Sequence, residues 1–88
     1  MRAADRKIIG GDIATVEYGW PVGMLVCRHL RSGVWEVRSD LDDGRISRVL
    51  FCFYDNKMVL LHGIIKKTQK TPPADINLSV KRKKEVER

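Results

Sequence analysis

The stretch ISRVLFCFYDNKMVLLHGII, residues 46–65, decides the fold of this 88-residue chain. Its two halves are rich in β-branched, aromatic and aliphatic residues, and Asp55-Asn56 between them is a two-residue turn signal. The sequence therefore predicts two strands, over 46–54 and 58–65, joined as an antiparallel hairpin. Both strands contain nearly continuous apolar runs, which predicts that they are buried on both faces or lie centrally in the sheet.

A further strand is predicted upstream of this hairpin, over 34–39. It is rich in β-branched and aromatic residues, and the turn-forming Asp42-Asp43-Gly44 separates it from the next strand. Residues 24–31 are predicted to be a connection, with room for a short strand or a turn. Three antiparallel strands in chain order form a meander, which is the sheet that we expect.

A helix is predicted before this sheet, from Arg2 to about Tyr18. Apolar residues recur on one face of it with helical spacing, namely Ile9, Ile13, Val16 and Trp20. The segment 19–23, with one proline and two glycines, ends this helix.

A second helix is predicted after the sheet. Thr71 is the predicted N-cap, Pro72 suits the first helical position, and Asp75 lies in the first turn. The prediction for residues 1–88 is thus a single α+β domain: an N-terminal helix, a three-stranded antiparallel β-meander and a basic C-terminal helix.

The net charge of +6 is concentrated in the last third of the chain. Residues 64–88 hold eight Lys or Arg and three Asp or Glu, whereas residues 1–63 hold nine and eight. A basic end favours a partner with an acidic surface, such as nucleic acid, anionic lipid or an acidic protein. A helix that is simply solvated would have the same composition.

The sequence has no signal-peptide pattern and no run approaching the roughly 20 apolar residues that cross a bilayer. We therefore expect a cytoplasmic protein with no membrane partner. Cys27 and Cys52 are far apart, which fits neither a disulfide framework nor a zinc site. Both are predicted to be buried apolar residues, and Trp20 and Trp35 are predicted to pack in the core.

Candidate chemistry rests on basic residues. No glycine-rich phosphate loop or metal-ligand cluster occurs, and the predicted strands supply one acid, Glu36, so we expect no metal and no cofactor. The bases on or just after the strands are Arg38, Arg48, Lys66, Lys67 and Lys70. RNA carries its own nucleophile, the 2′-hydroxyl, so such residues can promote its cleavage by stabilising phosphate charge and transferring protons. The alternative is that they only solvate an exposed sheet face.

The register of the hairpin predicts which of these residues converge. A two-residue turn pairs Arg48 with Gly63 and places Lys67 on the same face as Arg48. Arg38 joins that face if the first hairpin loop has an odd number of residues. His62 has the opposite parity and is predicted to be a hydrogen-bonded residue on an apolar face.

Three segments carry a resemblance to a known family: GVWEVR (33–38), RVLF (48–51) and LLHGIIKKTQKTP (60–72). They resemble the phage-derived, HigB-like branch of the RelE/ParE toxin superfamily. The upstream GWPVG (19–23) is also similar to a segment of that branch. The similarity runs in order from about residue 4 to residue 86.

The resemblance implies a compact toxin of a type II toxin–antitoxin system with a curved antiparallel sheet. Members commonly cut mRNA in the ribosomal A site, without metal, using basic residues on the sheet. By position, Arg38 and Arg48 would bind or polarise the scissile phosphate, and Lys67 would assist proton transfer. The other basic residues implied to contact RNA are Lys66, Lys70, Lys81, Arg82, Lys83 and Lys84. An antitoxin, often a helix-turn-helix DNA-binding protein, would be the partner that holds the toxin inactive.

Two departures from the family pattern accompany the resemblance. Members usually begin with a β-strand before the point that matches Ala4, so we expect an exposed sheet edge, which could pair two copies into a homodimer. Several RelE-type members place a tyrosine near the start of the last helix, where this chain has Pro73-Ala74-Asp75. Two other functions stay open: a ParE-like toxin that acts on DNA gyrase without cleavage, and a degenerate toxin that only binds antitoxin or nucleic acid.

Overall fold

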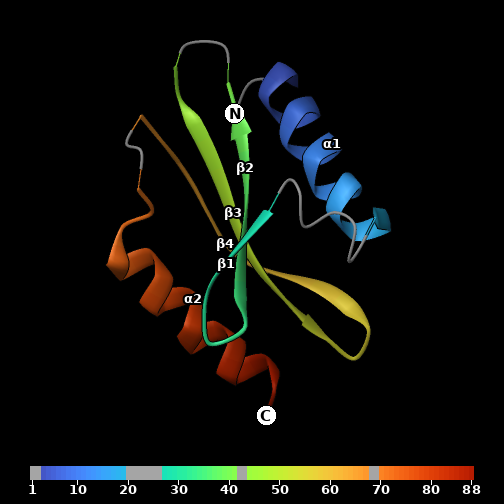
Figure 1. Cartoon of the computed structure of the whole chain (residues 1–88), viewed down its shortest axis with the longest axis vertical. Coiled ribbons are helices and arrows are strands. Elements are labelled where there is room, and N and C mark those ends of the chain that lie inside the picture. The colour runs from blue at the N-terminus through green and yellow to red at the C-terminus, as the bar shows by residue number, and fades with distance from the viewer. Residues whose placement is uncertain (1–2, 20–26, 42–43, 68–69) are drawn as a thin grey trace.

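The computed structural model describes residues 3–19, 27–41, 44–67 and 70–88. Within these ranges two helices and four strands follow one another (Figure 1): α1 (Ala3–Gly19), β1 (Cys27–Arg31), β2 (Val34–Asp40), β3 (Ile46–Tyr54), β4 (Lys57–Lys66) and α2 (Pro73–Val86). The strands form one antiparallel sheet in the order β1-β2-β3-β4. The α+β class and the meander are confirmed.

The sheet has one strand more than the three predicted. β1 occupies part of the region predicted to be a connection, and it pairs with β2 through a turn at Ser32 and Gly33. Both turn residues have positive φ, of 53° and 77° respectively, as a tight hairpin with right-handed strand twist requires. Three of the five residues of β1 are arginine or histidine, a composition that is characteristic of an edge strand and not of a central, buried strand.

The hairpin between β3 and β4 forms at the predicted place. Asp55 and Asn56 both have positive φ, of 54° and 62°, and Tyr54 pairs with Lys57 across them. β3 is central and mostly buried, as its apolar run predicts. The same prediction is wrong for β4, which lies at an edge of the described sheet and leaves Leu60 53% exposed.

The two helices cover opposite faces of the sheet (Figure 1), and each face has its own apolar cluster. On the α2 side, Ile76, Val80 and Val86 pack against buried residues of the strands: Val34, Leu50, Cys52 and Leu61. On the α1 side, Ile13 packs against Val37 and Phe51, and Trp35 joins this cluster as predicted. The prediction for Trp20 falls outside the described residues.

Helix α1 is also held by polar contacts. Asp5, which is buried, accepts a 2.9 Å hydrogen bond from Arg45, and Ser39 donates a 2.6 Å hydrogen bond to Asp12. Ile9 is buried on the face predicted from its spacing. These contacts fix α1 against the β2–β3 hairpin.

Helix α2 begins one residue later than predicted. Its N-cap is Pro72 rather than Thr71, and no side chain caps the first turn. The hydroxyl of Thr71 donates instead to Glu36 of β2, which provides a buried acceptor. Asp75 lies in the first turn of α2, as predicted.

Both cysteines are free thiols, Cys52 fully buried and Cys27 half-buried, and burial raises the pKa of each. Neither helix of the described part of the chain has the length and apolar character needed to cross a membrane.

Candidate functional site

Arg38 and Arg48 lie directly opposite each other on β2 and β3. The loop between these strands runs from Leu41 to Arg45, an odd number of residues, and the Leu41 amide donates to the Arg45 carbonyl across it. The condition under which Arg38 shares the face of Arg48 is therefore met. This face is the one that α2 covers, because Leu50 and Cys52 share the parity of Arg48 and pack against that helix.

A β-bulge in β4 changes the other predicted neighbours. Phe51 pairs with Leu60 but Leu50 pairs with His62, so Leu61 is an additional residue in β4. Beyond the bulge every side chain of β4 has the parity opposite to the prediction.

Three predictions are therefore wrong. Arg48 faces Ile64 rather than Gly63, and it is Lys66, opposite Ile46, that shares the face of Arg48 rather than Lys67. His62, predicted on the opposite face, joins this face as well.

The burial of the two arginines differs sharply. Arg48 is fully buried, whereas the side chain of Arg38 is exposed. Beside Arg48 lies Glu36, also fully buried, which accepts hydrogen bonds from Thr71 and, at 3.4 Å, from Arg28. Burial lowers the pKa of Arg48; Glu36 opposes this shift, and the charges of Arg38 and Arg28 add to it. The Nε and Nη1 atoms of Arg48 are buried without a hydrogen-bond partner in the described ranges. The guanidinium group interacts electrostatically with Glu36, Arg38 and Arg28.

These residues form an arginine cluster, which we define as Arg28, Arg38, Arg48 and Glu36. The cluster contains three guanidinium groups and one carboxylate, so it has an excess of positive charge, and exposed Arg38 presents that charge to solvent. Such an arrangement can bind a phosphate group through Arg38. Arg48 is too deeply buried to touch a ligand in this conformation, and it contributes through its electric field.

The lysines predicted to bind RNA fall into two groups. The exposed ones are Lys66 at the end of β4, Lys67 and Lys70 after it, and Lys81 and Lys84 on α2. Lys83 is half-buried: its Nζ pairs with Glu87 at 2.8 Å and its stem lies against the turn at Gly33. Arg82 donates a 2.7 Å hydrogen bond to the Leu61 carbonyl, so this arginine also takes part in holding α2 to β4.

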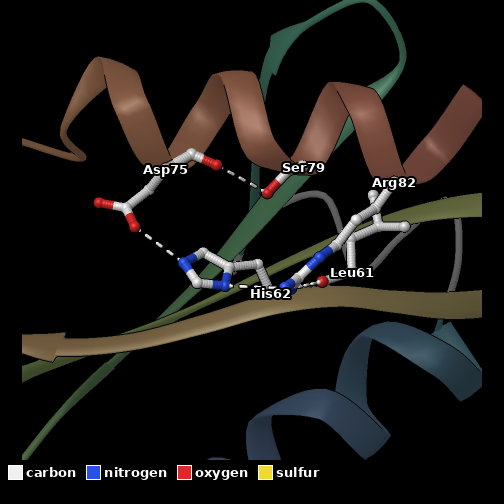
Figure 2. A network of polar contacts seen from close by, with 5 residues as sticks. All are labelled: Leu61, His62, Asp75, Ser79 and Arg82. Atoms are coloured by element: carbon white, nitrogen blue, oxygen red, sulfur yellow. Dashed lines mark hydrogen bonds and ion pairs between the residues drawn. The ribbon is translucent and has the colours of Figure 1, made fainter.

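A second polar group, the His62 network, joins β4 to α2 (Figure 2). It consists of His62, Asp75, Ser79 and Arg82. Asp75 and Arg82 both point from α2 toward His62: Asp75 Oδ1 lies 2.8 Å from His62 Nε2, and Arg82 Nη1 lies 3.3 Å from His62 Nδ1. The buried Ser79 donates to the backbone carbonyl of Asp75.

Sequence reasoning did not assign Glu36, Thr71 or Asp75 to a site. Glu36 could have been found, because a charged residue two positions after Val34, within the apolar first half of β2, has the parity of the buried face. Thr71 and Asp75 become partners only through tertiary structure. Among the residues described, no three His, Cys, Asp or Glu side chains come together as a metal site.

Comparison with known proteins places the chain in a family. A family model described as phage derived protein Gp49-like (DUF891) matches residues 1–84. No curated protein and no solved structure gives a significant match. The match covers nearly the whole chain, including the hairpin, the arginine cluster and most of α2. The chain therefore belongs to the Gp49-like family of phage-derived proteins, a toxin-like family in the area of RelE and HigB.

Proposed function

We propose that this chain is the toxin of a type II toxin–antitoxin system and that it cleaves mRNA on the ribosome without a metal ion. Membership of a toxin-like, phage-derived family supports the general class. The observation that carries the specific proposal is the arginine cluster, where exposed Arg38 stands directly opposite buried Arg48.

Like charges opposite each other on paired strands destabilise a sheet. Glu36 offsets part of this repulsion, but the arginine cluster has only one carboxylate for three guanidinium groups. A phosphate bound at Arg38 supplies the missing negative charge. The lysines around this face extend the positive surface, which suits the phosphates of a nucleic-acid backbone. Exposed Lys66 lies on the same face, at the end of β4.

The chemistry needs few groups because the 2′-hydroxyl of RNA attacks the neighbouring phosphate. The enzyme must orient that hydroxyl, stabilise the additional charge on the five-coordinate phosphate, and manage two protons. Arg38 performs the second task by direct contact, and Arg48 reinforces it from beneath. Lys66 takes the part that the family resemblance assigned to Lys67, because it is Lys66 that has the parity of the arginine cluster.

The test is induced expression followed by mapping of mRNA 5′ ends, for the wild type and Arg38→Gln. Arg38 is preferred to Arg48 for substitution because its side chain is exposed, so the variant keeps its fold. Arg6→Gln is the matched control, since Arg6 is an exposed arginine on α1, which covers the other face. We expect growth arrest and cuts within translated frames for the wild type and Arg6→Gln, and neither for Arg38→Gln.

Other outcomes would favour the other functions. Arrest without cuts would point to a protein target such as DNA gyrase. The absence of both would indicate a relative that keeps the fold and only binds antitoxin or nucleic acid. We also propose that an antitoxin, with acidic residues complementary to the basic face, neutralises the toxin, and co-expression of the neighbouring gene should then restore growth.

A further inference from the structure

The His62 network contains the groups that a proton transfer needs, and it lies on the face of the sheet that also carries the arginine cluster. His62 lies on the edge strand β4, and its side chain and that of Asp75 are each 19% exposed. Both can therefore be reached from solvent. Arg82, the member of the network that contacts Nδ1 of His62, is exposed.

The contacts define one tautomer of His62. An arginine N–H can only donate, so Nδ1 accepts from Arg82 and carries a lone pair. Nε2 then carries the proton and donates it to Asp75 at 2.8 Å. A carboxylate that holds one ring nitrogen as a donor leaves the other nitrogen as the base, which is the arrangement that orients a catalytic histidine.

Arg82 occupies the lone pair of Nδ1 only loosely. The Nη1 atom lies 3.3 Å from His62 Nδ1 and 2.7 Å from the Leu61 carbonyl, so the carbonyl is its stronger acceptor. A phosphate binds a guanidinium group with two charge-assisted hydrogen bonds, which are stronger than a contact with a neutral ring nitrogen. Binding of a phosphate at Arg82 would turn the group toward the phosphate and free Nδ1 beside it.

Resting on the function proposed above, we propose that His62 is the general base of RNA cleavage, that Asp75 positions it, and that Arg82 joins Arg38 in binding the scissile phosphate. The substrate is a single-stranded RNA that lies along β4. Lys66 lies on the same face of β4 as His62, and Arg38 lies on this face across the sheet.

The reaction balances with water as the only further participant. His62 Nδ1 takes the proton of the 2′-hydroxyl, and the 2′-oxygen forms a bond to phosphorus. The bond from phosphorus to the 5′-oxygen breaks, and that oxygen takes a proton from Lys66, which regains one from water. The products are a 2′,3′-cyclic phosphate and a 5′-hydroxyl, and the imidazolium returns its proton to solvent. Asp75 stabilises the imidazolium while it exists.

The alternative role of the network is structural, because it also fastens α2 to β4. His62→Gln separates the two roles. A glutamine amide can donate to Asp75 and its carbonyl can accept from Arg82, but glutamine cannot take up a proton. A structural role predicts that the variant keeps its cleavage rate, whereas the proposal predicts a loss on the order of 10²- to 10⁴-fold.

The experiment measures single-turnover cleavage of a defined mRNA on programmed ribosomes between pH 5.5 and about 8.5. The wild-type rate should fall toward the acidic end of this range, because a protonated imidazole cannot accept the proton of the 2′-hydroxyl. The groups that face His62 are Asp75 and Arg82 from α2, and Arg48 and Cys52 flank its partner Leu50 on β3. His29, the second histidine of the chain, is the control: His29→Gln should keep both the rate and the pH dependence.

Asp75→Asn tests positioning. Removal of the carboxylate makes the imidazolium less stable, so the acidic fall in rate should move to lower pH while the maximal rate decreases; a purely structural role would not move it. Asp75→Glu should restore part of the rate.

A cleavage rate for His62→Gln within threefold of wild type would overturn the inference and leave the proposed function intact. So would a wild-type profile that stays flat toward low pH, a result that does not depend on any variant folding. If the wild type cleaves no RNA, both the proposed function and the role of His62 fail. Thermal unfolding of each variant establishes that it is folded.

Discussion

Glu36 is a fully buried carboxylate in a strand whose neighbouring side chains are largely apolar. Its oxygens accept from Thr71 and Arg28, and its charge counteracts the desolvation of Arg48. Moving a charge out of water into the protein interior is costly, and a buried ion is stable only when its partners remain. At the scale of single residues, Glu36 is therefore the group on which the burial of Arg48 depends.

Glu36→Gln is expected to lower the free energy of unfolding by about 3 kcal/mol, because it leaves the buried charge of Arg48 uncompensated. Urea denaturation measures this value. Glu87→Gln removes a carboxylate from the solvent-accessible pair with Lys83, and a change within about 0.5 kcal/mol is expected there. Equal effects of the two substitutions would show that Arg48 does not need Glu36.

At the scale of elements, the turns and the bulge determine which side chains meet. The tight turn at Ser32 and Gly33 brings β1 onto β2, and that pairing carries Arg28 to Glu36. The stem of Lys83 from α2 lies against the same turn. One connection of two residues therefore contributes both to the arginine cluster and to the docking of the last helix.

The same substitution should have opposite effects in two elements. Gly33→Ala is expected to destabilise the protein by about 1 kcal/mol, because φ is +77° and only glycine adopts such values without strain. The displaced atom is the Cε of Lys83, the flexible end of a side chain, so the backbone accounts for most of this cost. Gly10→Ala in α1, where a Cβ meets nothing within 4 Å, should stabilise the protein by up to about 1 kcal/mol. Thermal unfolding compares them, and a shared sign would contradict the argument.

At the scale of the whole molecule, the sheet separates two chemically different sides. The side of α2 carries the arginine cluster, the His62 network, Lys66 and the basic residues of α2. The side of α1 is held by Asp5 and Asp12. The charge of the molecule is thus arranged for a polyanion that approaches from the side of α2.

Adjacent lysines of α2 should differ in their effect on RNA binding. Lys84 is exposed, whereas Lys83 is half-buried and paired with Glu87. With a 2′-O-methyl RNA that cannot be cleaved, the slope of log K against log salt should decrease by about 0.7 for Lys84→Gln, as loss of one contact to single-stranded nucleic acid implies. Lys83→Gln should change the slope less, and equal slopes would argue against a role for the exposed face of α2.

Sequence patterns predicted the elements better than the contacts between them. The bounds of β3 are those predicted, since its β-branched and aromatic residues and the Asp55-Asn56 turn are local signals. β1 was not predicted as a strand, because its residues have weak alternation and its conformation depends on pairing with β2.

The candidate site was predictable only in part. The parity of Arg38 and Arg48 followed from the length of one loop. The positions of His62 and Lys66 did not, because the bulge at Leu61 lies in an apolar run where no local residue marks it. The burial of Arg48 and Glu36 was not predicted, since it depends on a tertiary contact in which Thr71, after β4, donates a hydrogen bond to Glu36 of β2.

The additional residue at Leu61 has a consequence for the tolerance of the molecule to change. This residue shifts the alternation of side chains along β4 by one position. Without it, His62 and Lys66 would both face away from α2. A substitution along this strand alters the contacts of one side chain, whereas the deletion of one residue would change the face of His62 and Lys66 at once. The number of residues between the Asp55-Asn56 turn and Lys66 is consequently as much a functional property of this protein as the identity of any of them.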